Sequence, residues 1–163
     1  RLAIVGWPRH AGEPAEVDAA TRAAGQLGLA SMYHPIGNAA DVDAAYQRAV
    51  AFRADAVLAF ADGITIGLAD RFAANSRRDR MPAVSGWAVF AEKGNLMTYG
   101  PVLRESQGRL AVFVDRILKG AKAADLPVEQ PTVHELVINR RVAKDLGIAV
   151  PPTLLARADR IID

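Results

Sequence analysis

The chain has 163 residues, of which 51% are hydrophobic and 23% are charged, a composition typical of a globular domain with its own core. Its formal net charge is only +2 and its basic residues are scattered, which argues against a nucleic-acid-binding surface. The absence of cysteine excludes disulfides and thiolate metal sites, and no apolar run approaches the roughly 20 residues that a membrane helix needs.

The sequence begins at Arg1 and enters an apolar run, Leu2–Gly6, at once. We therefore expect no signal peptide or other leader within this sequence. A strand at the first residue is typical of a piece of a longer protein, and we expect the chain to be one. A processed mature chain is the alternative.

Strand-like and helical runs then alternate as far as Gly100. Between the apolar runs, helical spacing of apolar residues follows Pro14, Asn38 and Asp62, and one or two helical turns precede the fifth run. This order predicts an α/β fold, with a parallel sheet flanked by helices on both faces. The predicted strands are Leu2–Gly6, about 30–34, Ala56–Phe60, 81–86 and 95–100.

After Gly100 the pattern changes. A long amphipathic helix is predicted from about Arg104 to Lys119, followed by a polar loop. A last strand follows at 133–139, then a short helix ending at Gly147 and another begun by a proline at 151–152.

A carboxylate stands at the end of one predicted buried strand, where Asp62 precedes Gly63. In parallel sheets, ligands bind outside the carboxyl ends of the strands, so Asp62 is a candidate to bind a ligand ammonium or hydroxyl group. Aspartate is also a preferred helix N-cap, and capping alone is the alternative. Gly63 would let a ligand approach the backbone, or would simply begin the helix.

Aromatic and hydroxyl side chains follow the other strands at the same predicted edge. Trp7 is a candidate aromatic wall, with a partly buried core position as the alternative. For Trp87 the alternatives are the same, and the preceding Ser85 favours a position of this ring at the rim of a cleft. Tyr99, at the exit of the fifth strand, either faces the cleft or packs.

The sequence contains no recognisable catalytic or cofactor motif. The histidines, His10, His34 and His134, are too far apart to suggest a metal site. No Ser-His-Asp arrangement can be assigned, and there is no nucleophile elbow, Rossmann fingerprint or P-loop. We therefore predict that the protein is not an enzyme and carries no metal or cofactor.

The second half contains the stretches NLMTYGP, DRILKG, ADLPVEQPT, HELVIN and VPPTLLARAD. These closely resemble the C-terminal region of ABC-transporter substrate-binding proteins. In the first half, RLAIVGWP and LAFADG resemble the first and third strands of that family's second lobe. The resemblance covers essentially the whole chain. Val102, His134 and the loop at 7–10 depart from the family's usual residues, which affects the ligand class.

The resemblance implies a type I periplasmic-binding-protein fold, with two α/β lobes around a cleft. Residues 1–99 and 133–163 would form the second lobe, and 100–132 would cross to the absent first lobe. The implied function is solute binding for an ABC importer in the periplasm or another extracytoplasmic space, with an ABC permease as partner. The ligand would be a small molecule, and some members resemble aromatic amino-acid binders. A ligand-sensing domain of a transcription regulator is the alternative.

The long helix carries a stripe of apolar residues that a first lobe would cover. The stripe consists of Leu110, Val114, Ile117 and Leu118. A monomer seldom exposes such a patch, so for this chain alone we predict a homodimer in which these helices pack on each other or on the neighbour's sheet.

Overall fold

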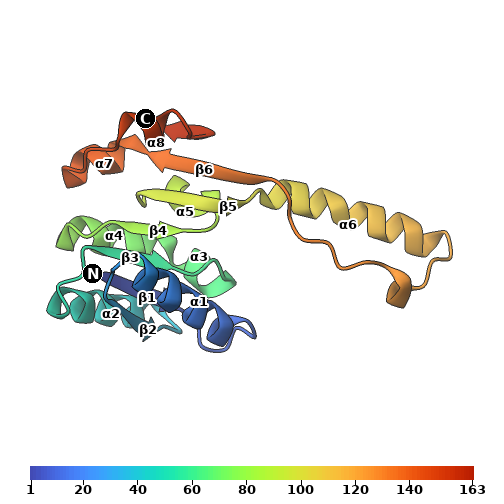
Figure 1. Cartoon of the computed structure of the whole chain (residues 1–163), viewed down its shortest axis with the longest axis horizontal. Coiled ribbons are helices and arrows are strands. Elements are labelled where there is room, and N and C mark those ends of the chain that lie inside the picture. The colour runs from blue at the N-terminus through green and yellow to red at the C-terminus, as the bar shows by residue number, and fades with distance from the viewer.

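A single sheet of seven strands runs through the molecule (Figure 1), and the computed structural model describes all of residues 1–163. The five apolar runs before Gly100 all form strands of this sheet, as predicted. The strands are β1 (Leu2–Gly6), β2 (Ser31–Pro35), β3 (Ala56–Ala59), β4 (Ala83–Ser85), β5 (Met97–Pro101), β6 (His134–Asn139) and β7 (Arg160–Ile162).

The strand order across the sheet is β2-β1-β3-β4-β5-β6-β7. Every neighbouring pair is parallel except β5 and β6, which are antiparallel. The predicted α/β fold with a largely parallel sheet is confirmed. The direction of β6 and the existence of β7 were not predicted. An apolar run does not encode its direction, and β7 has only three residues.

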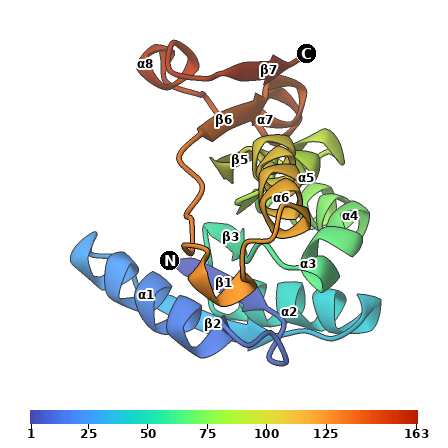
Figure 2. The same cartoon turned by 90° about the vertical axis from the view of Figure 1, so that its right-hand side faces the viewer.

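Eight α-helices and one 3-10 turn connect the strands. Figure 2 shows α1 on one face of the sheet beside β1 and β2, with α2, α4 and α5 on the other face. The helices are α1 (Glu13–Gln26), α2 (Ala39–Ala51), α3 (Gly63–Gly67), α4 (Ala69–Asp79), α5 (Ala88–Glu92), α6 (Leu103–Leu118), α7 (Arg140–Leu146) and α8 (Pro152–Leu155), and the 3-10 turn is Ala123–Asp125.

The main core lies between the sheet and helices α2, α4 and α5. Its centre is a chain of aromatic rings, one from each helix, and all three are fully buried. Phe72 meets Tyr46 edge to face at a centroid distance of 6.2 Å and Phe90 at 5.4 Å. Such contacts add to the hydrophobic free energy of burial and fix the three helices against one another.

Two helix starts follow the capping residues expected from the sequence. Asn38 caps α2, where its side-chain oxygen accepts hydrogen bonds from the backbone of Ala40 (2.8 Å) and Asp41 (3.2 Å). The helix predicted after Asp62 is instead two helices, α3 and α4, which meet at Leu68. The run Ile64-Thr65-Ile66 is β-branched and Gly67 follows it, so the first helix has low intrinsic propensity and ends after five residues.

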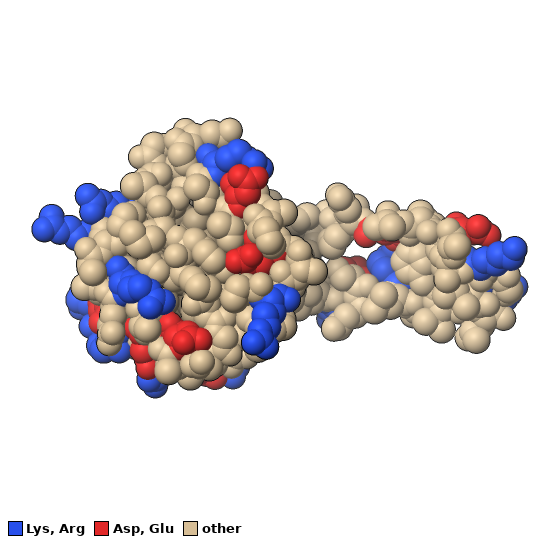
Figure 3. Space-filling model, turned by 90° about the horizontal axis from the view of Figure 1, so that it is seen from below, with Lys and Arg blue, Asp and Glu red and all other residues tan.

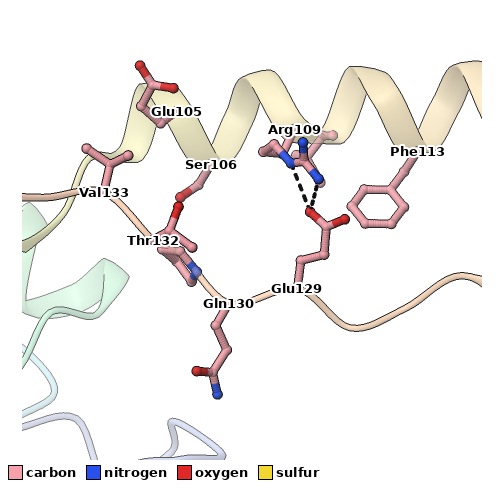
Figure 4. A pocket seen from close by; sticks show the side chains of 10 residues that line it. Glu105, Ser106, Arg109, Phe113, Glu129, Gln130, Thr132 and Val133 are labelled. Atoms are coloured by element: carbon pink, nitrogen blue, oxygen red, sulfur yellow. Dashed lines mark hydrogen bonds and ion pairs between the residues drawn. The ribbon is translucent and has the colours of Figure 1, made fainter.

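Residues 102–133, which we call the arm, extend away from the rest of the molecule (Figures 1 and 3). The arm contains α6 and a returning segment, and none of its residues is buried. The apolar stripe predicted on the long helix is uncovered, with Leu110 61% exposed and Leu118 82% exposed. Arg109 of α6 forms an ion pair with Glu129 of the returning segment and bridges a hollow of about 670 Å³ between them (Figure 4).

The arm leaves the sheet where two glycines touch. A Cβ built on Gly100 would lie 2.1 Å from the backbone oxygen of Gly86 and 2.8 Å from its carbonyl carbon. Both neighbours are backbone atoms, which cannot rotate away as a side chain can. Only glycine therefore lets β5 pass the end of β4 at this distance.

We predict that Gly100→Ala destabilises the chain by about 1–3 kcal/mol, because the added methyl group forces β4 and β5 apart. Gly25→Ala is the matched control, since a Cβ at Gly25 of α1 would meet nothing within 4 Å. The control should be neutral or slightly stabilising. Urea unfolding measures both variants, and equal stability of the two would contradict the close contact.

Candidate ligand-binding edge

The parallel strands all end at one edge of the sheet, and the arm leaves from this edge at the end of β5. Figure 2 faces this edge. The loops at 7–12 and 60–62 follow β1 and β3 there, and Gly86 and Trp87 follow β4. The sheet topology therefore brings Trp7, Asp62, Gly63 and Trp87 to the same edge, as the sequence predicts.

Asp62 is the N-cap of α3. Its Oδ1 accepts hydrogen bonds from the backbone N–H groups of Ile64 (2.9 Å) and Thr65 (2.8 Å). Its Oδ2 accepts one from the Thr65 hydroxyl at 2.7 Å. Asp62 is only 3% exposed. The capping role is thus present, and it holds a carboxylate rigidly at the end of β3.

A second carboxylate at this edge escaped the sequence analysis. Glu13, the first residue of α1, is 9% exposed. An acidic residue in the first helical turn is ordinarily interpreted as a partner of the helix dipole, so nothing in the sequence singles it out. Neither Glu13 nor Asp62 takes part in any ion pair of the molecule. Buried carboxylates usually have a cationic partner, so neither charge is balanced by an ion pair within the chain.

Tyr33 of β2 places a partly buried hydroxyl group beside the end of β1. Its hydroxyl donates a hydrogen bond to the Gly6 carbonyl oxygen at 3.2 Å. Burial raises the pKa of Tyr33 well above its ordinary value, and the Glu13 side chain and the Asp62 charge raise it further. The two carboxylates therefore act on the same hydroxyl group, and Tyr33 stays neutral as a donor.

The tryptophans and Gly63 border the open side of the edge. Trp7 and Trp87 are both half-buried. Gly63 is exposed, and a Cβ built on it would meet nothing within 4 Å. The backbone at the start of α3 therefore faces open space.

Ser85 and Tyr99 lie on the strands themselves and differ from the other candidates. Ser85 is 5% exposed, and its hydroxyl has no hydrogen-bond partner. The hydroxyl of Thr98, its register partner on β5, is also buried and unpartnered. Tyr99 is 65% exposed and stacks on His134 of β6 at a centroid distance of 6.0 Å, at the base of the arm.

The candidate edge is open in this chain. Neither of the two principal hollows contains Asp62, Gly63 or Trp87: one lies within the arm, and the other lies along β2 and reaches only Trp7. No group of three His, Cys, Asp or Glu side chains is placed to hold a metal ion. No helix is long and apolar enough to cross a membrane. The edge has the residue types of a ligand site but only one wall.

Solved structures with this fold include the following three. A conserved domain protein from Vibrio cholerae superposes with a TM-score of 0.91 and 24% identity, over 98% of this chain and 54% of that one. An ABC domain from Streptococcus pneumoniae, solved in complex with L-Trp, gives 0.90 and 19% over 99% and 54%. A ligand-free, open substrate-binding protein with adhesive properties from Clostridium difficile gives 0.70 and 17%, again over 99% and 54%.

The chain therefore spans about half the length of these solved proteins. The comparison with curated proteins gives no match. The family model described as ABC transporter substrate binding protein matches residues 3–162, nearly the whole chain, and the chain belongs to this family.

Proposed function

We propose that the chain is the second lobe of a two-lobed solute-binding protein that captures a small molecule at the sheet edge and delivers it to an ABC permease. One observation carries this proposal: the arm leaves and re-enters the sheet at the edge that holds Asp62, Glu13 and the tryptophans. A second lobe attached through the arm would face that edge and supply the missing wall. Such capture would take place outside the cytoplasm and involve no chemical turnover.

The first lobe would also cover the arm. We propose that residues 1–99 and 133–163 form one lobe and that 100–132 pack on the other. No residue of the arm is buried. The apolar residues Leu110, Val114 and Ile117 of α6 are each at least 46% exposed. The homodimer predicted from this stripe finds no support in the structure or in the comparisons, and the first lobe replaces it as the proposed covering surface.

The charge of the edge favours a ligand with an ammonium group. Asp62 and Glu13 are buried without a cationic partner, and a ligand ammonium would supply the missing positive charge. Trp7 and Trp87 would line the apolar part of the ligand. An amino acid combines these features, and one structure of the same fold was solved with L-Trp.

Asp62→Asn in the whole two-lobed protein should weaken amino-acid binding about ten- to a hundredfold, since a hydrogen bond to a charged group contributes about 1.5–3 kcal/mol. Stability should change little, because asparagine also caps helices. Glu13→Gln should weaken binding in the same direction. Calorimetric titration with the twenty amino acids first identifies the ligand, and then measures each variant.

Asp70→Asn is the control for the loss of one carboxylate, because Asp70 is exposed and pairs only with Lys93 on the surface. It should bind the ligand as the unsubstituted protein does. If Asp62→Asn folds normally and binds with unchanged affinity, Asp62 is only a helix cap.

A second prediction concerns the arm. Leu110→Asp combined with Val114→Asp should destabilise the whole protein by several kcal/mol, because each apolar side chain buried against the first lobe contributes roughly 1.5–3 kcal/mol. In the 163-residue chain the same pair is exposed, and the change should cost little. Thermal unfolding of both proteins gives the comparison.

Light scattering completes this test. The chain alone should have a mass near 17.4 kDa. A mass of twice that value, reduced by the double substitution, would instead show that a second copy covers the stripe. Equal losses of stability in the chain and in the whole protein would contradict the proposed packing.

A further inference from the structure

A hollow of about 910 Å³ lies along the free edge of β2, away from Asp62 and Trp87. Its walls are the loop after β1, the strand β2 with the loop that follows it, and helix α2 from its N-cap Asn38 to Arg48 in its last turn. Figure 3 views the molecule from the side on which β2 and α2 lie in Figure 1, and basic and acidic side chains are interspersed over that side. The polar and aromatic residues that line the hollow are Trp7, Arg9, Tyr33, His34, Asn38, Asp41 and Arg48.

A buried histidine fixes one of its two arginines. The Nε of Arg48 donates a hydrogen bond to Nδ1 of His34 at 3.3 Å, and His34 is only 2% exposed. Accepting this bond requires an unprotonated Nδ1, so the neutral imidazole carries its proton on Nε2. Burial lowers the pKa of His34, and the Arg48 charge lowers it further, which keeps the ring neutral. Both Nη groups of Arg48 have no acceptor in the molecule.

The free charge in the hollow is positive. Arg9 is exposed and takes part in no ion pair, and Arg48 also lacks a carboxylate partner. The hollow's one carboxylate, that of Asp41, is already engaged: it accepts hydrogen bonds from the Gly37 backbone (2.8 Å) and from Nδ2 of Asn38 (2.9 Å). Two guanidinium groups therefore face a space whose only acidic group is held by its own loop.

We propose that this hollow is a second binding site, next to the sheet edge and sharing Trp7 with it, which takes the oxyanion group of a small molecule between Arg9 and Arg48. A guanidinium presents paired N–H donors that match the geometry of carboxylate and phosphate oxygens. His34 is a positioning residue, because it holds the Nε of Arg48 and leaves the Nη donors directed to a ligand. The Trp7 ring lines the same hollow and is available to the rest of the molecule bound there.

Amide NMR spectra of the isotope-labelled chain test this site directly. Inorganic phosphate and acetate are titrated in parallel, against sodium chloride at equal ionic strength. We expect saturable shifts of amides around the hollow, at Arg9, His34 and Gly37, with at least one oxyanion and not with chloride. The tighter of the two probes tells whether the site prefers phosphate or carboxylate.

Variants separate the proposed site from non-specific attraction. Arg48→Gln should raise the Kd of the probe about tenfold or more, whereas Arg104→Gln, the same loss of charge on the exposed arm, should leave it unchanged. His34→Phe should weaken binding, because phenylalanine cannot accept from Arg48. His34→Asn should largely restore it, since the amide oxygen replaces Nδ1 as acceptor.

The same spectra show whether each variant is folded. Shifts that do not saturate, shifts that map to the sheet edge at 62–65, or equal Kd values for Arg48→Gln and the unsubstituted chain would each overturn the proposal.

Discussion

The antiparallel pairing of β5 with β6 determines how the rest of the molecule is arranged. Five residue pairs join the two strands, from Met97 with Ile138 to Pro101 with His134. Because the strands run in opposite directions, the arm must leave and return at the same edge of the sheet. The parallel strands β1 to β4 end at that edge as well. One pairing thus places the connections to any further lobe next to the candidate ligand residues.

Local capping and the proposed ligand recognition converge on the same side chain. Asp62 uses both oxygens to begin α3, so its carboxylate is rigid and pre-oriented before any ligand arrives. Three hydrogen bonds offset much of the cost of burying its charge, yet no cation balances it. Glu13, at the start of the helix that follows β1, is a second buried carboxylate. Burial is the main cause that raises the pKa of Tyr33, and Glu13 and Asp62 raise it further. A cationic ligand group would relieve this imbalance.

Local sequence signals predict most of the fold. Strand-forming runs mark six of the seven strands, and Asn38 and Asp62 cap helices where their residue types indicate. Features set by tertiary contacts are missed. The reversal of β6 depends on the arm, and β7 depends on its pairing with β6. Helices α3 and α4 are separated at Leu68 because the β-branched run before it has a low helix propensity. The spacing of apolar residues alone does not reveal this low propensity.

The candidate site was predicted less completely, for similar reasons. The carboxyl ends of parallel strands point to Trp7, Asp62 and Trp87 from topology alone. Sequence position does not tell that the Ser85 hydroxyl is buried while Tyr99 is exposed. Glu13 and the pair His34–Arg48 become visible only when α1 and α2 are folded against β1 and β2.

The central claim is that the sheet edge and the base of the arm together form one wall of a ligand cleft. Hydrogen exchange of the whole two-lobed protein, with and without its amino-acid ligand, tests it most directly. The account predicts that added protection concentrates at residues 7–13, 62–65, 86–88 and the two crossovers at 99–102 and 132–134. Protection confined to other parts of the lobe, with these segments unchanged under saturating ligand, would contradict it.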